Sequence, residues 1–414
     1  MDSAQVCRST TSQQHPSSAA VTDVSSVVAL SSDSPQKHVK LFYRTAWDQA
    51  WVHGSVCGNT WQDHPLLPVT SAPGRWLTAT FPTGSPGASS EEGAADGGSS
   101  SPALLEFVVT DRSDAWDKPE TGSNYRITSP GTYTLSGGAL SPVSGRPVML
   151  VSDLDGTMVG DDEASGAFKA WWQEAGVTRG GVLVYNTGRA LDSFQALLSD
   201  KSHCLAPPDA LISAVGTKVY EFESGRWRED QEWTALLGEG WDLAVAREAA
   251  YRTLAQVGKD VMHFRPPDEQ NDHKVTCGLA VAVLPQALAS LSALLEGGGV
   301  QANVIVSGAG DWRYVDIVPI RAGKLEALHH VRRRHGFEVS STVACGDSGN
   351  DILMLSGLNP AIVVGNAQPD LRAWLETRQR VEAAPAPGAP PRLLLATQHE
   401  AYGILEGLEA LGFL

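Results

Sequence analysis

After residue 147 the chain alternates short apolar runs with segments of helical texture. The apolar runs lie at residues 148–152, 182–185, 210–213 and 343–345. Short apolar strands that alternate with helices are typical of a parallel sheet covered on both faces. The pattern predicts an α/β fold, with a core formed by residues 144–220 and 316–414. A last helix is expected at residues 399–411, after a linker rich in Pro and Ala at residues 383–391.

Residues 221–315 interrupt this alternation and predict an inserted α+β domain. They contain tryptophan-bearing helical segments and strand-like stretches at residues 274–283 and 303–307. The most apolar part of the chain, residues 278–295, contains Pro285, which favours a strand followed by an amphipathic helix over a membrane span. We therefore expect no membrane partner.

The region before residue 144 consists of short β-rich segments separated by Gly, Pro and Asp turns. These segments lie at residues 39–43, 76–81, 104–110 and 132–135. They predict a small antiparallel β-sandwich over residues 38–143. Residues 82–102 are rich in Gly, Ser and Ala and are interpreted as a loop within that sandwich. The serine-rich residues 1–37 predict a disordered leader.

Charge and cysteine content exclude several classes of partner. The 31 Lys and Arg residues against 47 Asp and Glu residues give a formal net charge of −16, which disfavours nucleic acid and anionic membranes. Five cysteines without CxxC spacing indicate reduced thiols in an intracellular compartment. We expect a cytoplasmic location, and a chloroplast location stays open because the leader, with one arginine (Arg8), does not decide between them.

Two carboxylates, Asp153 and Asp155, follow the first apolar run of the predicted core in the sequence DLDGT. Open α/β sheets bind ligands at the carboxyl ends of their strands. Two like charges beside a buried strand are unfavourable unless a cation or a proton compensates them. Asp347 and Asp351 follow another apolar strand, and oxygen ligands of this kind suit Mg²⁺. The sequence therefore predicts a magnesium site among Asp153, Asp155, Asp347 and Asp351, at which Asp153, Asp347 and a backbone carbonyl near Asp155 supply the oxygen ligands.

Two further polar residues complete a site suited to phosphoryl transfer. Thr187 follows the apolar run at residues 182–185, and Lys324 stands at a predicted helix start. A phosphoryl group in flight needs cations and hydrogen-bond donors around its equatorial oxygens. Taken alone, a lysine such as Lys324 is more often a solvated helix residue, and a threonine such as Thr187 is more often a capping residue. Their order among the carboxylate motifs favours the functional interpretation.

These four elements, in this order, resemble the motifs of the haloacid dehalogenase phosphatases over about residues 147–368. The resemblance implies a Rossmann-like core with a cap domain at residues 221–315. It also implies roles for five residues: nucleophile for Asp153, general acid and base for Asp155, Mg²⁺ ligand for Asp347, and support of the metal for Asp351 and Asn350.

Within that superfamily the chain resembles sucrose-phosphate phosphatase most. The matching phrases are SDLDGTMV at residues 152–159, LVYNTGR at 183–189, AVGT at 214–217, HKV at 273–275, GDSGND at 346–351 and NAQ at 366–368. The resemblance implies that the cap binds the sugar. The substrate contacts that it implies are Thr157, Gly188, Arg189, Gln270, His273, Lys274 and Asn350. Around residues 307–316 the chain departs from the family, with a longer loop that carries Trp312, Arg313 and Tyr314.

Residues 38–137 resemble carbohydrate-binding modules that recognise starch. Matching phrases include LFYRT at residues 41–45, AWVH at 50–53, FVVTD at 107–111 and NYRI at 124–127. The resemblance implies a glucan site lined by His53, Trp61 and Trp116, because sugar rings stack on aromatic side chains.

We expect an enzyme that hydrolyses sucrose 6-phosphate to sucrose and phosphate, with a sugar phosphate and starch or another α-glucan as its partners. Two alternatives remain: a phosphatase for another sugar phosphate or for phosphorylated glucan, and a glucan-binding regulatory protein without turnover. The chemical roles filled by Asp153, Asp155, Thr187, Lys324 and Asp347 favour the enzyme.

Overall fold

The structure, a computed structural model, describes residues 38–69, 71–83, 103–223, 225–308, 310–379 and 391–414. The predicted leader, most of the predicted loop at residues 82–102 and most of the predicted linker at residues 383–391 lie outside the described residues. The described chain divides into two compact units, residues 38–144 and 145–414.

In the first unit the strands follow the order β6-β5-β2-β3-β4-β1-β8-β9, with β7 paired to β5. The strands are β1 His38–Arg44, β2 Ala50–Val56, β3 Gln62–Pro68, β4 Leu77–Pro82, β5 Leu105–Thr110, β6 Trp116–Asp117, β7 Tyr125–Ile127, β8 Gly131–Ser136 and β9 Ala139–Pro142. β3 pairs with β2 along its first part and with β4 at Leu67 and Pro68, so it connects two groups of strands. Both groups contribute alternate residues, such as Leu41 and Phe107, to one buried core. β1 and β8 pair in parallel, unlike the antiparallel pairing predicted for this unit.

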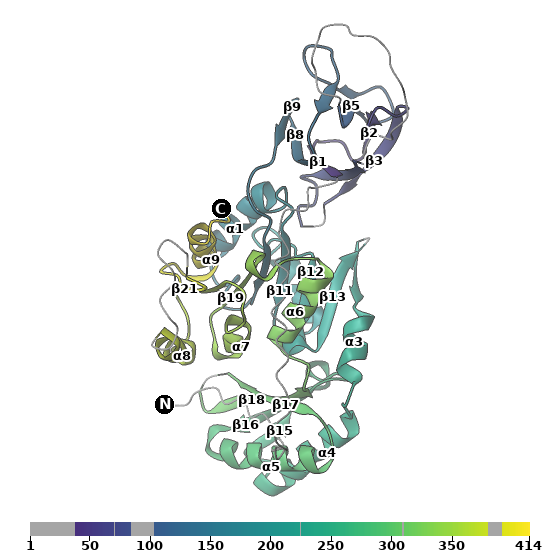
Figure 1. Cartoon of the computed structure of the whole chain (residues 1–414). Helices are drawn as coiled ribbons and strands as arrows, with labels where there is room; N and C mark the ends of the chain where they lie inside the picture. The colour runs from purple at the N-terminus through teal and green to yellow at the C-terminus, as the bar shows by residue number, and fades with distance from the viewer. Residues whose placement is uncertain (1–37, 70, 84–102, 224, 309, 380–390) are drawn as a thin grey trace, which may run out of the picture. The chain divides into compact units, whose positions relative to one another are not determined.

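The second unit is built on a sheet of eight described strands in the order β14-β13-β12-β11-β10-β19-β20-β21 (Figure 1). Its strands are β10 Met149–Ser152, β11 Val182–Asn186, β12 Ala210–Ser213, β13 Lys218–Glu223, β14 Arg226–Glu229, β19 Thr342–Gly346, β20 Ala361–Val363 and β21 Leu393–Leu395. The six strands β12, β11, β10, β19, β20 and β21, which are neighbours in this order, pair in parallel. β13 and β14 extend the sheet beyond β12 by antiparallel pairing. All four residues of β10 are buried, as expected for a central strand with helices on both faces.

Helices cover both faces of this sheet. They are α1 Asp162–Trp171, α2 Leu191–Asp200, α3 Gln231–Gly238, α6 Lys324–Arg334, α7 Ile352–Leu355, α8 Pro369–Gln379 and α9 Glu400–Ala410. α3, α6, α7 and α8 share a core with one face, through residues such as Trp233 and Leu328. α9 packs on β20 from the opposite face, where a Cβ at Gly407 would lie 2.5 Å from Ile362, and α1 contacts α9. Within the described residues, none of the helices is long and apolar enough to cross a membrane.

Between α3 and α6 the chain forms a second, smaller sheet with two helices, here named the insert (residues 243–319). Its elements are α4 Leu243–Val257, β15 Met262–Phe264, β16 Val275–Ala280, α5 Leu284–Gly297, β17 Ala302–Ser307 and β18 Trp312–Pro319. The strands are antiparallel in the order β15-β16-β18-β17. α4 and α5 lie together on one face of this sheet (Figure 1), where Ala250, Leu291 and Val315 belong to a separate core.

The insert begins later than predicted. β13 pairs with β12 in the main sheet and β14 pairs with β13, while Trp233 and Leu237 of α3 are buried in the main core. Residues 221–238 therefore belong to the core, and not to the cap predicted at residues 221–315. β18 continues the insert as far as Pro319. The prediction placed the boundary too early because helical segments with tryptophan occur both in a core and in a separate domain, since both bury apolar residues.

Candidate active site

Parallel strand pairing brings three of the predicted site residues to one edge of the main sheet. β10 lies between β11 and β19, and its last residue, Ser152, pairs with the next-to-last residue of each neighbour. Asp153, Thr187 and Asp347 directly follow these three strands, and all three side chains are buried. This edge is the carboxyl end of the parallel strands, where ligands of such sheets bind.

Lys324 joins this edge from the first turn of α6. Its ammonium donates hydrogen bonds to Oδ1 of Asp153 (2.6 Å), Oδ1 of Asp351 (2.7 Å) and Oδ1 of Asn350 (3.1 Å). The Lys324 side chain is 2% exposed, so water screens these charges weakly. Gly323, directly before it, has a φ of +138°, a backbone conformation that favours glycine. The turn that aims Lys324 at the carboxylates therefore depends on this glycine.

Asp347 is held in place by two other motifs. Its Oδ1 accepts a hydrogen bond from Oγ1 of Thr157 (3.1 Å), and its Oδ2 accepts one from Nε2 of Gln368 (3.1 Å). Gly156 permits this approach, because its φ is +82° and a Cβ there would lie 2.7 Å from Oδ2 of Asp347. The backbone N–H of Asp347 donates to Oδ2 of Asp351 (3.2 Å). Three sequence motifs, those of Thr157, Asp347 and Gln368, thus meet at this position.

Burial and crowding shift the proton equilibria of this cluster. Loss of hydration, followed by repulsion from Asp351, raises the pKa of Asp347 to about 6. Loss of hydration also raises the pKa of Asp153, against the attraction of Lys324. Burial opposes the charge on Lys324, but Asp153 and Asp351 hold its pKa above the ordinary lysine value. The ammonium is therefore charged at neutral pH, while the carboxylates lack sufficient positive charge around them.

The donor set fits the predicted divalent cation. Asp153, Asp347 and Asp351 offer carboxylate oxygens that lie within 4.8 Å of one another. The Lys324 ammonium contacts Asp153 and Asp351 but not Asp347, so a divalent cation would balance the remaining negative charge of the three buried carboxylates. Asp153 and Asp347 are the better placed ligands. Asp351 already accepts hydrogen bonds from Lys324 and from backbone N–H groups, and so it orients the cluster.

Asp155, which we predict as a further metal ligand, is not part of this carboxylate group. It forms a two-bond pair with the Arg189 guanidinium, from Nε to Oδ2 (2.8 Å) and from Nη2 to Oδ1 (2.7 Å). Its side chain is 54% exposed. The hydrogen bonds from Arg189 to Asp155 raise the pKa of the guanidinium. This pairing with Arg189 accounts for the absence of the Asp155 carboxylate from the group of Asp153, Asp347 and Asp351.

The cluster opens into a cavity of about 1100 Å³ that the core and the insert line together. The predicted residues that line it are Asp153, Asp155, Thr187, Gly188, Arg189, Gln270, Lys274 and Asn350. Gln270 contributes mainly to the shape of the cavity wall, because its side-chain amide bonds the backbone of Arg265 and Thr276. Thr157 does not line the cavity and instead supports Asp347.

His273 is predicted to contact the substrate, but the structure does not place it on this cavity. The side chain is buried, and its Nδ1 has no hydrogen-bond partner among the described residues. Burial lowers the pKa of the imidazole, so the ring is neutral at neutral pH. His273 lies in a tight turn, in which the backbone N–H groups of Asn271 and Lys274 each donate to the carbonyl oxygen of the other. Lys274, at the end of this turn, lines the cavity, whereas the buried His273 does not.

The cavity lining includes insert residues that are not predicted from the sequence, among them Asn271, Thr276 and Asp316. Oδ1 of Asp316 accepts a hydrogen bond from Oγ1 of Thr276 (2.7 Å) and lies 3.7 Å from Nζ of Lys274. The side chains of Lys274, Thr276 and Asp316 are all buried. A signal for Asp316 exists in the sequence, because a carboxylate interrupts the otherwise apolar residues 315–318.

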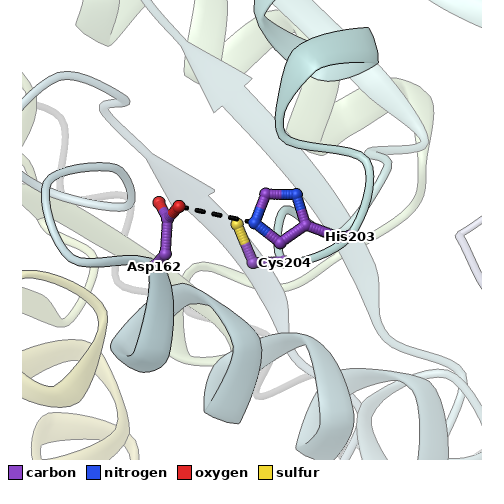
Figure 2. Close-up of side chains that lie close together, drawn as sticks. All are labelled: Asp162, His203 and Cys204. Carbon is purple, nitrogen blue, oxygen red and sulfur yellow. Dashed lines mark ion pairs between the residues drawn. The ribbon is translucent and has the colours of Figure 1, made fainter.

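A second group of metal-ligating residue types, Asp162, His203 and Cys204, lies in the same unit (Figure 2). Asp162 and His203 form an ion pair of 3.4 Å. However, the Lys201 ammonium already contacts both oxygens of Asp162, at 2.8 and 3.1 Å. Burial raises the pKa of the Cys204 thiol, which opposes the thiolate that a metal binds. The group is therefore explained as a surface ion-pair cluster.

In the first unit, the three residues predicted to bind glucan lie together. The ring centroid of His53 is 5.3 Å from that of Trp61 and 5.8 Å from that of Trp116. Trp61 is 37% exposed and Trp116 is 51% exposed. Nδ1 of His53 lies 2.7 Å from Oδ1 of Asp63, which fixes the orientation of the imidazole. Exposed aromatic rings beside hydrogen-bonding groups are suited to stacking against a sugar ring.

Comparison with known proteins connects the second unit to one family. Residues 146–412 match the family described as sucrose-6F-phosphate phosphohydrolase. Sucrose-phosphatase 1 of Nicotiana tabacum is 31% identical over 269 residues, which are 63% of this chain and 58% of that protein. The chain thus matches less than two thirds of the length of this relative. Mannosylfructose-phosphate phosphatase of Agrobacterium fabrum is 29% identical over 270 residues, which are 64% of this chain and 98% of that protein.

A solved structure gives the same relationship at the level of the fold. The sucrose-phosphatase of Synechocystis, solved in complex with sucrose and phosphate, has a TM-score of 0.54 and 31% sequence identity to this chain. The similarity covers 65% of this chain and 99% of that one. The prediction of a haloacid dehalogenase fold for the core is confirmed. Since the matched residues 146–412 make up more than half of the sequence, the chain belongs to the sucrose-6F-phosphate phosphohydrolase family.

Proposed function

We propose that this protein is a Mg²⁺-dependent phosphatase that hydrolyses sucrose 6-phosphate to sucrose and inorganic phosphate. One observation carries the proposal: Asp153, at the carboxyl end of the central strand, is joined through Lys324 to Asp351 in a buried cluster that also holds Asp347. The family relationship and the sucrose-phosphatase relatives support the choice of substrate.

In the first chemical step Asp153 acts as the nucleophile. A carboxylate oxygen of Asp153 forms a bond to phosphorus while the bond from phosphorus to the sugar oxygen breaks. Asp155 gives its proton to the leaving sugar oxygen, which leaves as a hydroxyl. Asp155 already lines the cavity, and for this role its carboxyl group must give up its hydrogen bonds to Arg189.

In the second step water releases the phosphate. The Asp155 carboxylate takes a proton from a water molecule, whose oxygen bonds to phosphorus as the bond from phosphorus to Asp153 breaks. The products are inorganic phosphate and the restored carboxylate of Asp153. Lys324 favours that restored carboxylate, because its ammonium lies 2.6 Å from Oδ1 of Asp153. Thr187 and Asn350 line the same cavity and supply polar groups for the phosphoryl oxygens.

A bound Mg²⁺ would neutralise phosphoryl charge and orient the phosphate at this site. Asp153 and Asp347 are the ligands that fit it, and Asp351 would keep them in place. Lys324 lies on the Asp153 and Asp351 side of the cluster, so it would remain available as a second positive charge.

The insert would act as the cap that binds the sugar. Lys274, Thr276 and Asp316 present an ammonium, a hydroxyl and a carboxylate to the cavity, and Asn271 adds an amide. Sugar hydroxyls require donors and acceptors in such a mixed arrangement. The amide of Asn271 also donates to Oγ1 of Thr217 in the core (2.9 Å), so one hydrogen bond joins the insert to the core beside the proposed sugar site.

Phosphate release from a small panel of substrates tests this proposal. The panel contains sucrose 6-phosphate, glucose 6-phosphate, trehalose 6-phosphate and phosphorylated glucan, each with Mg²⁺ and with a chelator. The proposal predicts that sucrose 6-phosphate is preferred and that the chelator abolishes release. Preference for another member of the panel would assign the site to that substrate, and no release from any of them would favour a non-catalytic protein.

We further propose that the first unit binds starch or another α-glucan. The cluster of His53 with the exposed rings of Trp61 and Trp116 supports this second role. Retention of the protein on insoluble starch measures it. Substitution of both tryptophans by Ala is expected to weaken retention about tenfold or more, whereas Leu67→Ala, at a position that is 62% exposed, serves as the control. Equal retention of all three proteins would reject the glucan site.

A further inference from the structure

The open face of the insert sheet carries a row of residues that continues beyond the proposed sugar contacts. Residues two apart on a strand share a face, so Asp316, Tyr314 and Trp312 follow one another on one side of β18. Strand register places Gly278 of β16 beside Tyr314, and His263 of β15 beside Gly278. The α4 and α5 helices cover the other face, which includes Val315. The row is therefore on the face without helices.

The far part of this row forms an aromatic platform, which we define as His263, Trp312 and Tyr314. The ring centroids of His263 and Trp312 are 5.0 Å apart. Trp312 and Tyr314 are each 42% exposed. Gly278 is needed for this arrangement, because a Cβ there would lie 2.6 Å from ring atoms of His263. A side chain at position 278 would displace the imidazole from its place beside Trp312.

A fixed cation accompanies the platform. The guanidinium carbon of Arg265 lies 5.0 Å from the ring centroid of Tyr314. Arg265 is held by Glu269, whose carboxylate accepts hydrogen bonds from both Nε and Nη2. Aromatic rings offer a stacking surface for the apolar face of a sugar, and a fixed guanidinium offers donors for its hydroxyls. The combination is suited to a saccharide ring.

The platform adjoins the cavity of the candidate active site. Tyr314 and Arg313 line the same cavity as Asp153. Its volume of about 1100 Å³ slightly exceeds the range of ordinary small-molecule pockets, roughly 300–1,000 Å³. On β18, Tyr314 lies roughly 7 Å and Trp312 roughly 13 Å beyond Asp316, given a rise of about 3.3 Å per residue. These steps lead away from the polar group formed by Lys274, Thr276 and Asp316.

We propose that Trp312 and Tyr314 form an outer saccharide subsite, which binds a hexose unit attached to the disaccharide that the inner cavity holds. This proposal rests on the proposed function and extends its substrate class. The protein then accepts phosphorylated saccharides of three or more sugar units, and it binds free trisaccharides that contain sucrose more tightly than sucrose itself.

Competition between free sugars tests the outer subsite in the full-length protein. Sucrose and raffinose, which is sucrose with one further hexose, are compared as inhibitors of phosphate release from sucrose 6-phosphate in the presence of Mg²⁺. The proposal predicts that the inhibition constant of raffinose is about fivefold or more below that of sucrose. Trp312→Ala and Tyr314→Ala are each expected to shrink that ratio by about two- to tenfold, the range of a single aromatic contact.

Tyr251→Ala is the matched control, because Tyr251 is an exposed tyrosine of α4 that packs on Phe264. It should leave the ratio between the two sugars unchanged. A raffinose constant no lower than that of sucrose, or a ratio that survives both platform substitutions, would overturn the proposal. If sucrose 6-phosphate releases no phosphate, the proposed function fails instead. In that case calorimetric titration of the same proteins with free sucrose and free raffinose measures the two dissociation constants. Their ratio then tests the outer subsite in place of the ratio of inhibition constants.

Discussion

Lys324 is the residue on which the charge balance of the candidate active site depends. Its buried ammonium faces Asp153 and Asp351 at 2.6 and 2.7 Å. Lys324→Met would leave these buried carboxylates without that cation. We expect the free energy of unfolding at neutral pH without Mg²⁺ to fall by about 3–5 kcal/mol, as for other broken buried ion pairs.

Urea denaturation measures this free energy, and the exposed control Lys259→Met should stay within about 0.5 kcal/mol of the parent. A loss below about 1 kcal/mol would show that the carboxylates do not need this ammonium.

Asp155 is expected to act on protons and not on the metal. Asp155→Asn keeps the size of the side chain but removes the acid and base, so kcat for phosphate release should fall about 10²- to 10⁴-fold. Steady-state assays with Mg²⁺ measure the change, and the exposed Asp260→Asn is the control. Mg²⁺ affinity should be unchanged in Asp155→Asn, because the carboxylate pairs with Arg189 instead of the cluster. Weakened Mg²⁺ binding would restore Asp155 as a ligand.

At the residue scale, sequence reasoning succeeded where chemistry and strand position coincide. Asp153 and Asp347 directly follow apolar strands, so their meeting at one sheet edge follows from parallel pairing. The substrate contact of His273 stays a prediction, because the side chain does not line the cavity that its sequence neighbour Lys274 lines. Thr276 and Asp316 were missed, because their contact depends on the register of β16 with β18, which no local pattern specifies.

The strands and helices of the core were predictable because the apolar pattern and the residues that begin or end an element indicate the same bounds. The predicted strand at residues 148–152 corresponds to β10 Met149–Ser152, and the predicted helix at residues 399–411 corresponds to α9 Glu400–Ala410. The apolar stretch at residues 278–295 divides into β16 and α5, as Pro285 at the helix start indicates. The edge hairpin of β13 and β14 was assigned to the wrong domain, since edge pairing is a tertiary choice.

The end of α6 carries a contact that depends on pH. His335, at the C-cap of α6, lies 3.2 Å from both oxygens of the buried Glu221 of β13. Burial opposes the imidazolium, but Glu221 raises the pKa of His335 above its ordinary value. A histidine with a raised folded pKa stabilises the fold fully below the unfolded value of about 6.5. That stabilisation disappears as pH rises through the folded pKa.

His335→Gln tests this contact. Compared with the parent, the variant should be less stable by about 1–2 kcal/mol near pH 5.5, the size of a favourable histidine at a helix end. The difference should approach zero near pH 9. Urea unfolding of the two proteins across this pH range measures it, and a constant difference at all pH values would contradict a charged His335.

At the scale of the whole molecule, the two units have separate hydrophobic cores. Domains with separate cores fold as separate units.

We expect calorimetry to resolve two unfolding transitions in the full chain. Mg²⁺ with phosphate should raise only the transition of residues 145–414, and a soluble α-glucan only that of residues 38–144, by mass action. At a hundredfold excess over the dissociation constant, each ligand adds about 2.7 kcal/mol. A single transition that responds equally to both ligands would contradict this division.

The central claim, that Asp153 is the nucleophile of a sugar phosphatase, is tested most directly by the covalent intermediate. The protein is mixed with sucrose 6-phosphate and Mg²⁺, quenched in acid, and analysed by peptide mass spectrometry alongside Asp153→Asn. The account predicts a phosphoryl group on the peptide that contains Asp153, its absence from the variant, and a fall in kcat of about 10³-fold or more. Turnover by Asp153→Asn at a rate near that of the parent would contradict the account.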